Sequence, residues 1–162
     1  MIENKLTFRK AKRKDLSLIL FFIKQIAIYE KMEDQVQANI NNLEEYIFKR
    51  KLVRVIFLVY EKKEIGFALF FTNFSTFVGR GGLYLEDIYI LPSYRHRGFG
   101  KQTMIYLAKL AKEENLGRFE WVCLNWNTPS INFYESIGAK RLSEWNIFRL
   151  DQEGINKLSD DK

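Results

Sequence analysis

The sequence predicts an α/β fold, with a mixed β-sheet flanked by helices in a single domain that spans residues 1–162. Apolar residues recur with the 3.6-residue helical period at 16–27 and 103–111. Runs rich in β-branched and aromatic residues, such as 53–61 and 83–90, alternate with these helical segments. The resulting order, β-α-α-β-β-β-α-β-α-β-β, is typical of a sheet covered by helices. With 162 residues and 47% hydrophobic content, the chain can bury a core of its own.

The first half of the chain is expected to contain two helices and three strands. In order, they are a strand at 7–10, a helix capped by Asp15, a short helix at 43–48 capped by Asn42, and strands at 53–61 and 65–74. Lys62 and Lys63 form the turn between the last two strands.

The second half is expected to alternate strands and helices before a polar tail at about 151–162. A glycine-containing loop at 75–82 leads into a strand at 83–90 that Pro92 ends. A helix at about 98–114 follows, and it is expected to bury Met104, Leu107, Ala108 and Ala111. After it come a buried strand at 118–124, a helix from Asn127 to about Ser136, and a hairpin at 140–150. Asn127 and Pro129 suit a helix start, and Gly138 suits a left-handed C-terminal cap.

A basic, glycine-containing loop lies between the strand at 83–90 and the helix that follows it. Its sequence is Arg95-His96-Arg97-Gly98-Phe99-Gly100-Lys101. Glycines let the backbone approach a ligand closely, and a helix N-terminus favours negative charge, so the segment predicts a diphosphate site. It lacks the third glycine of a dinucleotide fingerprint, and Arg95 and Gln102 break a Walker pattern. The spacing that fits is Arg-x-x-Gly-x-Gly; the alternative is a basic loop whose glycines only allow turning.

Composition excludes several other classes of protein. The formal net charge is +6, but the basic residues are dispersed and no zinc-finger or RNP-type motif is present, so we expect no nucleic-acid partner. The longest apolar runs are too short to span a bilayer, and residues 1–5 show no signal peptide, so we expect a cytoplasmic protein without membrane contact. A single cysteine, Cys123, excludes an internal disulfide and a cysteine-based zinc site, and we expect no metal.

Four segments together resemble one family. They are residues 28–36 (IYEKMEDQV), 84–87 (YLED), 94–100 (YRHRGFG) and 126–134 (WNTPSINFY). In order and spacing they are similar to the diamine acetyltransferase branch of the GNAT superfamily, the spermidine/spermine and thialysine acetyltransferases. The resemblance implies the GNAT fold, a twisted mixed sheet splayed between strands 4 and 5. It also implies acetyl-CoA as co-substrate, a small amine as acceptor, and a homodimer.

The resemblance also assigns roles to individual residues. Glu86 would be the base that helps remove the amine proton, and Tyr134 the acid that protonates the leaving thiolate. Cofactor contacts would come from Ile88, Tyr89, Ile90, Arg95, His96, Arg97, Gly98, Phe99, Gly100, Lys101, Asn127, Thr128, Pro129 and Ser130. Acceptor contacts would come from Tyr29, Glu30, Glu86, Glu120, Trp121, Val122 and Glu144.

The chemistry of amine acetylation suits these residue types, although each has a structural alternative. An alkylamine with a pKa near 10.4 is almost fully protonated at pH 7, so a base is needed, and the departing thiolate needs an acid. Glu86 and Asp87 could both be charges at a strand end; since adjacent strand residues point to opposite faces, only one should face the substrate, and we select Glu86. Tyr134 could be a core tyrosine beside Phe133. Cys123 could suggest a covalent acetyl-enzyme, but its apolar neighbours favour a buried thiol and direct transfer in a ternary complex.

The acceptor is less well defined than the reaction. Ser75 stands where polyamine-acetylating members carry an aspartate, which favours a shorter diamine or a lysine-like amine of the thialysine type. The alternatives are a peptide or protein amine, an aminoglycoside, or an acetyl-CoA-binding module without catalysis.

Overall fold

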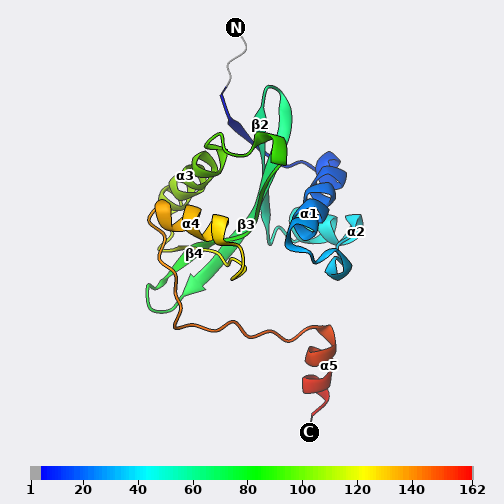
Figure 1. Cartoon of the computed structure of the whole chain (residues 1–162). Coiled ribbons are helices and arrows are strands. Elements are labelled where there is room, and N and C mark those ends of the chain that lie inside the picture. The colour runs from blue at the N-terminus through cyan, green and yellow to red at the C-terminus, as the bar shows by residue number, and fades with distance from the viewer. Residues whose placement is uncertain (1–4, 162) are drawn as a thin grey trace. The chain divides into compact units, whose positions relative to one another are not determined.

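The computed structural model describes residues 5–161, so the predicted chain start at 1–4 and the last residue of the predicted tail lie outside it. The chain divides into two compact units, Met1–Val122 and Cys123–Lys162, which are described separately (Figure 1). In residues 5–161 no helix is both long enough and apolar enough to cross a membrane.

The first unit is built on a five-stranded sheet with the order β1-β2-β3-β4-β5. Its strands are β1 (Thr7–Lys10), β2 (Arg54–Tyr60), β3 (Lys63–Ser75), β4 (Arg80–Ile90) and β5 (Phe119–Glu120). Neighbouring strands from β1 to β4 are antiparallel, whereas β4 and β5 are parallel. The predicted mixed sheet is therefore confirmed.

Helices cover both faces of this sheet. α1 (Leu16–Glu30) and α2 (Ile40–Leu43) lie on one side, and α3 (Phe99–Glu113) lies on the other (Figure 1). Short 3-10 turns occur at Arg13–Asp15, Glu33–Gln35 and Pro92–Tyr94, and a π-helical segment at Glu44–Lys49 follows α2. The α1 side of the core contains Ile19 and Phe22 packed against Phe57 and Phe67. The opposite side buries Leu58, Ile65 and Phe99.

An ion-pair network fixes the start of α1 to the sheet. Arg9 on β1 donates two hydrogen bonds to Asp15, of 2.8 and 3.0 Å, and two to Glu64 on β3, of 3.0 and 2.8 Å. The Asp15 carboxylate also accepts a 2.7 Å bond from the Lys12 backbone N–H. Asp15 is the N-cap of α1 by position, as predicted, but its side chain makes no cap hydrogen bond because these partners occupy it.

Three predictions for the first unit were wrong in detail. Asn39, not Asn42, caps the short second helix: its side chain accepts the Asn42 backbone N–H. The strand predicted at 118–124 is confined to Phe119–Glu120 and is half-buried, because its ladder with β4 joins only Leu83 with Phe119 and Tyr84 with Glu120. Ala108 is exposed, whereas Met104, Leu107 and Ala111 are buried as predicted.

The second unit contains two helices joined by an extended segment. α4 (Thr128–Ser136) begins at Asn127, whose side chain accepts the Ser130 backbone N–H, and Gly138 has the left-handed φ of 90°. Both features agree with the sequence. Residues 140–150 form no strand, so the predicted hairpin was wrong; an isolated two-stranded hairpin is marginal without a third strand or a helix to pack on. The expected polar tail contains α5 (Gln152–Asp160), capped by Asp151, which accepts the Gly154 N–H.

Candidate active site

The basic loop ends at the N-terminus of α3, as the sequence predicts. Gly98 is the N-cap residue, with φ of 76°, and a Cβ added there would meet no atom within 4 Å. The Gln102 N–H already bonds to the Gly98 carbonyl, so the N–H groups of Phe99, Gly100 and Lys101 lie in the first turn, where a helix supplies no internal acceptor. These groups and the positive end of the helix dipole can hold an anion.

The side chains of this loop divide into an anchor and an exposed cationic part. Phe99 is buried and packs on Tyr60, with ring centroids 4.9 Å apart. His96, Arg97 and Lys101 are exposed around the open backbone turn. An exposed cationic turn over free N–H groups fits the diphosphate of a CoA-type ligand in charge and donor chemistry.

Arg95 differs from the rest of the loop because its side chain turns inward. Its Nε donates a 2.8 Å hydrogen bond to the Ile90 carbonyl. Its guanidinium carbon lies 5.1 Å from the ring centroid of Tyr29 on α1 and 5.1 Å from that of Tyr89 on β4. Arg95 thus links the loop to the end of β4 and to the last turn of α1.

The end of β4 provides the backbone expected to meet the pantetheine arm. Ile88, Tyr89 and Ile90 pair with Ala68, Phe67 and Gly66 of β3. A Cβ at Gly66 would lie 2.3 Å from the Tyr89 carbonyl oxygen, so the close approach of these strands requires glycine. The ladder with β5 involves only Leu83 and Tyr84, and residues 85–90 of β4 continue past it.

Three carboxylates gather between β4 and the C-terminal end of α1. Glu30, Glu86 and Asp87 interact electrostatically with one another. Burial, with the neighbouring Glu86 and Glu30 charges, raises the pKa of Asp87 from 3.8 to about 7. Burial and the charge of Glu86 also raise the pKa of Glu30. Such a cluster lowers its own energy by binding a cation.

A second group of candidate acceptor residues lies where β4 meets β5. Tyr84 pairs with Glu120, and burial together with the charges of Glu86 and Glu120 raises the pKa of the Tyr84 phenol. Glu120 accepts a 3.2 Å hydrogen bond from the Asn73 amide and lies 3.8 Å from an Arg118 nitrogen. The predicted residues Trp121 and Val122 follow directly, half-buried and exposed respectively.

The remaining predicted residues belong to the second unit. Asn127 is buried at the start of α4, and Thr128, Pro129 and Ser130 form the first turn. Tyr134 is half-buried, with its ring centroid 5.3 Å from that of Phe133. Glu144 is exposed within the extended segment. Cys123 is half-buried rather than buried, and its thiol lies 3.7 Å from the Leu124 carbonyl oxygen.

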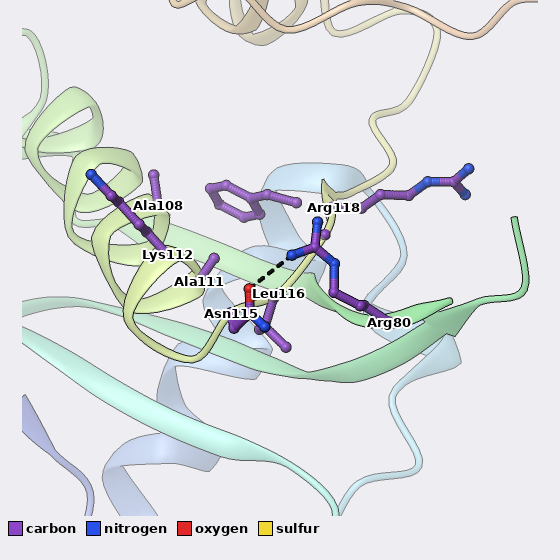
Figure 2. A pocket seen from close by; sticks show the side chains of 9 residues that line it. Arg80, Ala108, Ala111, Lys112, Asn115, Leu116 and Arg118 are labelled. Carbon is purple, nitrogen blue, oxygen red and sulfur yellow. Dashed lines mark hydrogen bonds between the residues drawn. The ribbon is translucent and has the colours of Figure 1, made fainter. Parts of the chain in front are cut away.

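Figure 2 shows a hollow of about 390 Å³ lined in part by residues at the C-terminal end of α3, whereas the basic loop lies at the N-terminal end of that helix. It is lined by Arg80, Ala108, Ala111, Lys112, Asn115, Leu116, Gly117, Arg118 and Phe119, and Arg80 bonds to Asn115 at 2.8 Å within it (Figure 2). The C-terminal end of a helix carries partial negative charge, which disfavours a diphosphate. This hollow includes none of the predicted site residues, and we do not assign the site to it.

Sequence reasoning did not identify two features of the candidate site. These are the presence of Asp87 in the carboxylate cluster and the stacking of Arg95 on two aromatic rings. The aromatic residues at 29 and 89 were a signal for the stacking of Arg95, but only the fold shows that they meet. In residues 5–161 no three His, Cys, Asp or Glu side chains are placed to hold a metal ion.

Comparison with known proteins identifies the family of the chain. Residues 21–139 match the acetyltransferase (GNAT) family. Thialysine N-epsilon-acetyltransferase of Sus scrofa is 32% identical over 163 positions, covering 93% of this chain and 95% of that protein. L-ornithine N5-acetyltransferase NATA1 of Arabidopsis thaliana is 41% identical over 93 residues, or 57% of this chain; the match spans 41% of that longer protein.

Solved structures show the same fold. An integron cassette protein from the mobile metagenome of V. cholerae has a TM-score of 0.79 and 29% identity, with 96% of this chain and 98% of that chain covered. An aminoglycoside acetyltransferase from an uncultured soil metagenomic sample has a TM-score of 0.76 at 15% identity, with 93% of this chain and 100% of that chain covered. At this identity the similarity bears on the fold alone.

The chain belongs to the acetyltransferase (GNAT) family, and the predicted membership is confirmed. It is an acetyl-transferring enzyme whose relatives include the thialysine and ornithine acetyltransferases.

Proposed function

We propose that this enzyme transfers the acetyl group of acetyl-CoA to a primary amine of a small diamine, polyamine or lysine-like acceptor of the thialysine type. The observation that carries the proposal is the cluster of Glu30, Glu86 and Asp87 between β4 and α1. A cationic amine would relieve the mutual repulsion of these carboxylates, whereas an anionic or neutral acceptor would not. The thialysine relatives, similar over nearly the whole chain, support the same class of acceptor.

Acetyl-CoA would be held by the basic loop and the backbone at the end of β4. The first-turn N–H groups, with Arg97 and Lys101, would bind the diphosphate, and the family resemblance adds Asn127 to Ser130 as further cofactor contacts. Bound acetyl-CoA supplies an activated thioester carbonyl. Backbone N–H groups of Ile88 to Ile90 would stabilise the oxyanion that forms on it.

Two side chains would handle the protons of the reaction. A carboxylate on β4 removes a proton from the bound ammonium, and Glu86 is the one that the family match selects. The Tyr134 phenol gives its proton to the departing CoA sulfur. We propose direct transfer in a ternary complex, because the chain's one histidine, His96, is far from Cys123 in sequence and Cys123 has apolar neighbours there.

The size of the acceptor follows from the turn after β3. Ser75 is buried, and its Oγ accepts the Val78 N–H at 3.2 Å while its carbonyl accepts the Gly79 N–H. The hydroxyl is therefore used within the turn and supplies no charge for a distant second ammonium. This favours a short diamine or a lysine-like amine over spermine.

We also propose that the enzyme works in the cytoplasm as a homodimer. Residues 140–150 are extended and expose Trp145, Ile147 and Phe148, with 70%, 71% and 92% of each side chain accessible. Apolar surface of this kind is typical of protein interfaces, and a second copy is the partner that family resemblance suggests.

The decisive experiment measures CoA release from acetyl-CoA by the purified full chain. The panel of acceptors is putrescine, spermidine, spermine, ornithine, thialysine, lysine, an aminoglycoside and a lysine peptide. The variant is Tyr134→Phe, and the matched control is Tyr46→Phe, because Tyr46 is an exposed tyrosine remote in sequence from every predicted site residue.

We expect turnover with a small cationic amine that Tyr134→Phe lowers by about 100-fold or more while acetyl-CoA affinity changes little. Tyr46→Phe should match the wild type. Turnover only with the peptide or the aminoglycoside would refute the small-amine class. Silence with every acceptor, while acetyl-CoA binds, would indicate a non-catalytic module.

A further inference from the structure

A side-chain hydrogen bond crosses three strands of the sheet, from β3 over β4 to β5. The amide of Asn73 on β3 donates to the Glu120 carboxylate on β5 at 3.2 Å. In the ladders, Asn73 pairs with Gly82 of β4, and Glu120 pairs with Tyr84 of β4. Asn73 and Glu120 are both half-buried, so the bond is partly shielded from water. It joins two strands that have β4 between them.

The bond can form because β4 has no side chain at the crossing point. A Cβ added at Gly82 would lie 2.4 Å from the Asn73 side-chain oxygen. Neighbouring strands are about 4.8 Å apart, so an amide and a carboxylate two strands apart meet only when nothing stands between them. The φ of Gly82 is not in the left-handed region, and alanine can adopt that backbone. This glycine therefore provides space rather than an unusual conformation.

The bond lies on the face of the sheet that packs on α1. Leu69 of β3 belongs to the core on that side, and Phe71 and Asn73 follow it at alternate positions, so all three share the face. Phe71 pairs with Tyr84, and their rings stack with centroids 5.0 Å apart. Glu120 pairs with Tyr84 and lies on the same face. This face also holds the three carboxylates between β4 and α1, which we call the acidic cluster: Glu30, Glu86 and Asp87.

The register places Glu120 a short distance from the acidic cluster. Asp87 pairs with Leu69, and Tyr84 pairs with Phe71, so the two pairs are separated by two residues of β3, or about 7 Å. Glu120 lies one strand further, about 4.8 Å to the side, which makes its Cα about 8 Å from that of Asp87. A second carboxylate at this distance suits a short diamine, in which a few methylene groups separate two positive charges.

The Glu120 carboxylate is oriented but keeps its charge. Asn73 is neutral, so its amide fixes one carboxylate oxygen without cancelling the negative charge. An Arg118 nitrogen lies 3.8 Å from the other oxygen, which is longer than a hydrogen bond, and 41% of the Arg118 side chain is accessible. Exposed ion pairs of this kind are weak in water. Because an ionised carboxylate has about four acceptor positions, Glu120 can accept a further donor.

We propose that Glu120 binds the second, non-reacting ammonium of the acceptor, and that Asn73 is a positioning residue that orients the Glu120 carboxylate through the space at Gly82. This inference rests on the proposed function and narrows its acceptor to a compound with two cationic amines. The Ser75 hydroxyl, further along β3, accepts the Val78 N–H within its own turn. The second charge of the acceptor is therefore recognised at Glu120 and not at that turn.

The test compares kcat/KM for putrescine with kcat/KM for pentylamine, in which a methyl group replaces the second ammonium. Their ratio measures selectivity for a second charge, and a general loss of activity or of folded protein leaves it unchanged. We expect the wild type to prefer putrescine. Glu120→Gln should lower the ratio by about 10-fold or more, mainly by raising KM for putrescine, because a charge-assisted hydrogen bond is lost. Asn73→Ala should lower it by about 3- to 10-fold.

Two further variants separate positioning from direct contact. Gly82→Ala should lower the ratio as much as Asn73→Ala does, because the added Cβ displaces the Asn73 amide while Asn73 and Glu120 are both still present. The matched control is Gly81→Ala, whose Cβ would instead meet the Thr72 and Leu116 side chains; it should keep the wild-type ratio. Asn73→Ala combined with Glu120→Gln should lower the ratio no further than Glu120→Gln alone, because Asn73 acts through Glu120.

Turnover of both amines with a ratio that Glu120→Gln leaves unchanged would overturn the inference and leave the proposed function intact. Equal kcat/KM for the two amines in the wild type would do the same. Losses that add fully in the double variant would remove the positioning role of Asn73.

If no amine is acetylated, the proposed function fails, and binding measured by calorimetry in the presence of CoA tests the inference instead. A preference of the wild type for putrescine over pentylamine that Glu120→Gln abolishes would support the site. An equal preference in both proteins, or no binding of putrescine, would refute it.

Discussion

Asp87→Asn should make the protein more stable at alkaline pH. An unperturbed aspartate has a pKa of 3.8, the value we take for Asp87 in the unfolded chain, whereas the pKa of Asp87 is about 7 in the folded chain. Because the folded state holds this proton more tightly, the unfolded state is favoured as pH rises from about 4 to about 7, and stability falls across that window. At 1.36 kcal/mol per pH unit, the three units correspond to a loss of up to about 4 kcal/mol. Asparagine has no such dependence.

Urea denaturation of wild type and Asp87→Asn at pH 5 and pH 8 measures this effect. The stability difference in favour of the variant should grow by about 2–3 kcal/mol between the two values, because the carboxyl titrates over about two units of that range. The slope of stability against pH is informative even if the amide packs less well, since poor packing shifts both values equally. Asp34→Asn, at an exposed acid, controls for a general change of charge. A constant difference between pH 5 and pH 8 would refute the claim that Asp87 is held protonated by its surroundings.

Three further predictions concern the framework around the site. Hydrogen bonding to Arg9 lowers the pKa of Asp15, so the stability that this ion pair contributes is present above pH 3.8 and is lost as the pH falls below that value. Asp15→Asn should therefore lower the free energy of unfolding at pH 7 by about 1–3 kcal/mol, and the difference from wild type should vanish in acid. Glu44→Gln, which removes an exposed ion pair with Arg13, should change the free energy of unfolding by less than about 1 kcal/mol. Gly66→Ala should destabilise by about 1–3 kcal/mol in urea denaturation, because its Cβ would meet backbone at the end of β4; a change of a few tenths would contradict that contact. Trp145→Ser with Phe148→Ser should convert a dimer to a monomer in sedimentation, with circular dichroism unchanged; an intact dimer would rule these side chains out of the interface.

The sequence predicted the elements whose signals are local. The periodicity of α1 and α3 and the Asn127 cap depend on neighbouring residues, and each agrees with the structure. The turn predicted at Lys62 and Lys63 lies one residue earlier, at Glu61 and Lys62, and Lys63 begins β3. The hairpin at 140–150 did not form, because the stability of a hairpin depends on a surface outside the segment. The loop before α3 could be predicted as an anion site because glycines and cations at a helix start are the groups that bind anions, and that role stays a prediction.

A β-bulge at Glu86 marks the limit of that reasoning: Leu69 of β3 pairs with Asp87, but the next residue, Phe70, pairs with Leu85. Alternation along YLED assigns one carboxylate to each face, and nothing in those four residues signals an extra position. The bulge exists because β3 and β4 pair on both sides of it in registers that differ by one residue, which is a property of two strands together. The premise of unbroken alternation was therefore wrong, while the role of Glu86 stays a prediction.

The cluster that the bulge creates works against folding, and this connects it with function. A buried carboxyl with two like charges beside it can reduce stability by up to about 4 kcal/mol above pH 7, a large share of the 5–15 kcal/mol typical of a domain. Among residues 5–161, the charges that act on Asp87 are those of Glu86 and Glu30, and both are negative. The Arg95 guanidinium stacks on Tyr29, the neighbour of Glu30, but its Nε is directed to the Ile90 carbonyl. A ligand that brings positive charge gains the interaction that the protein lacks, and this is the physical basis for expecting a cationic amine at this position.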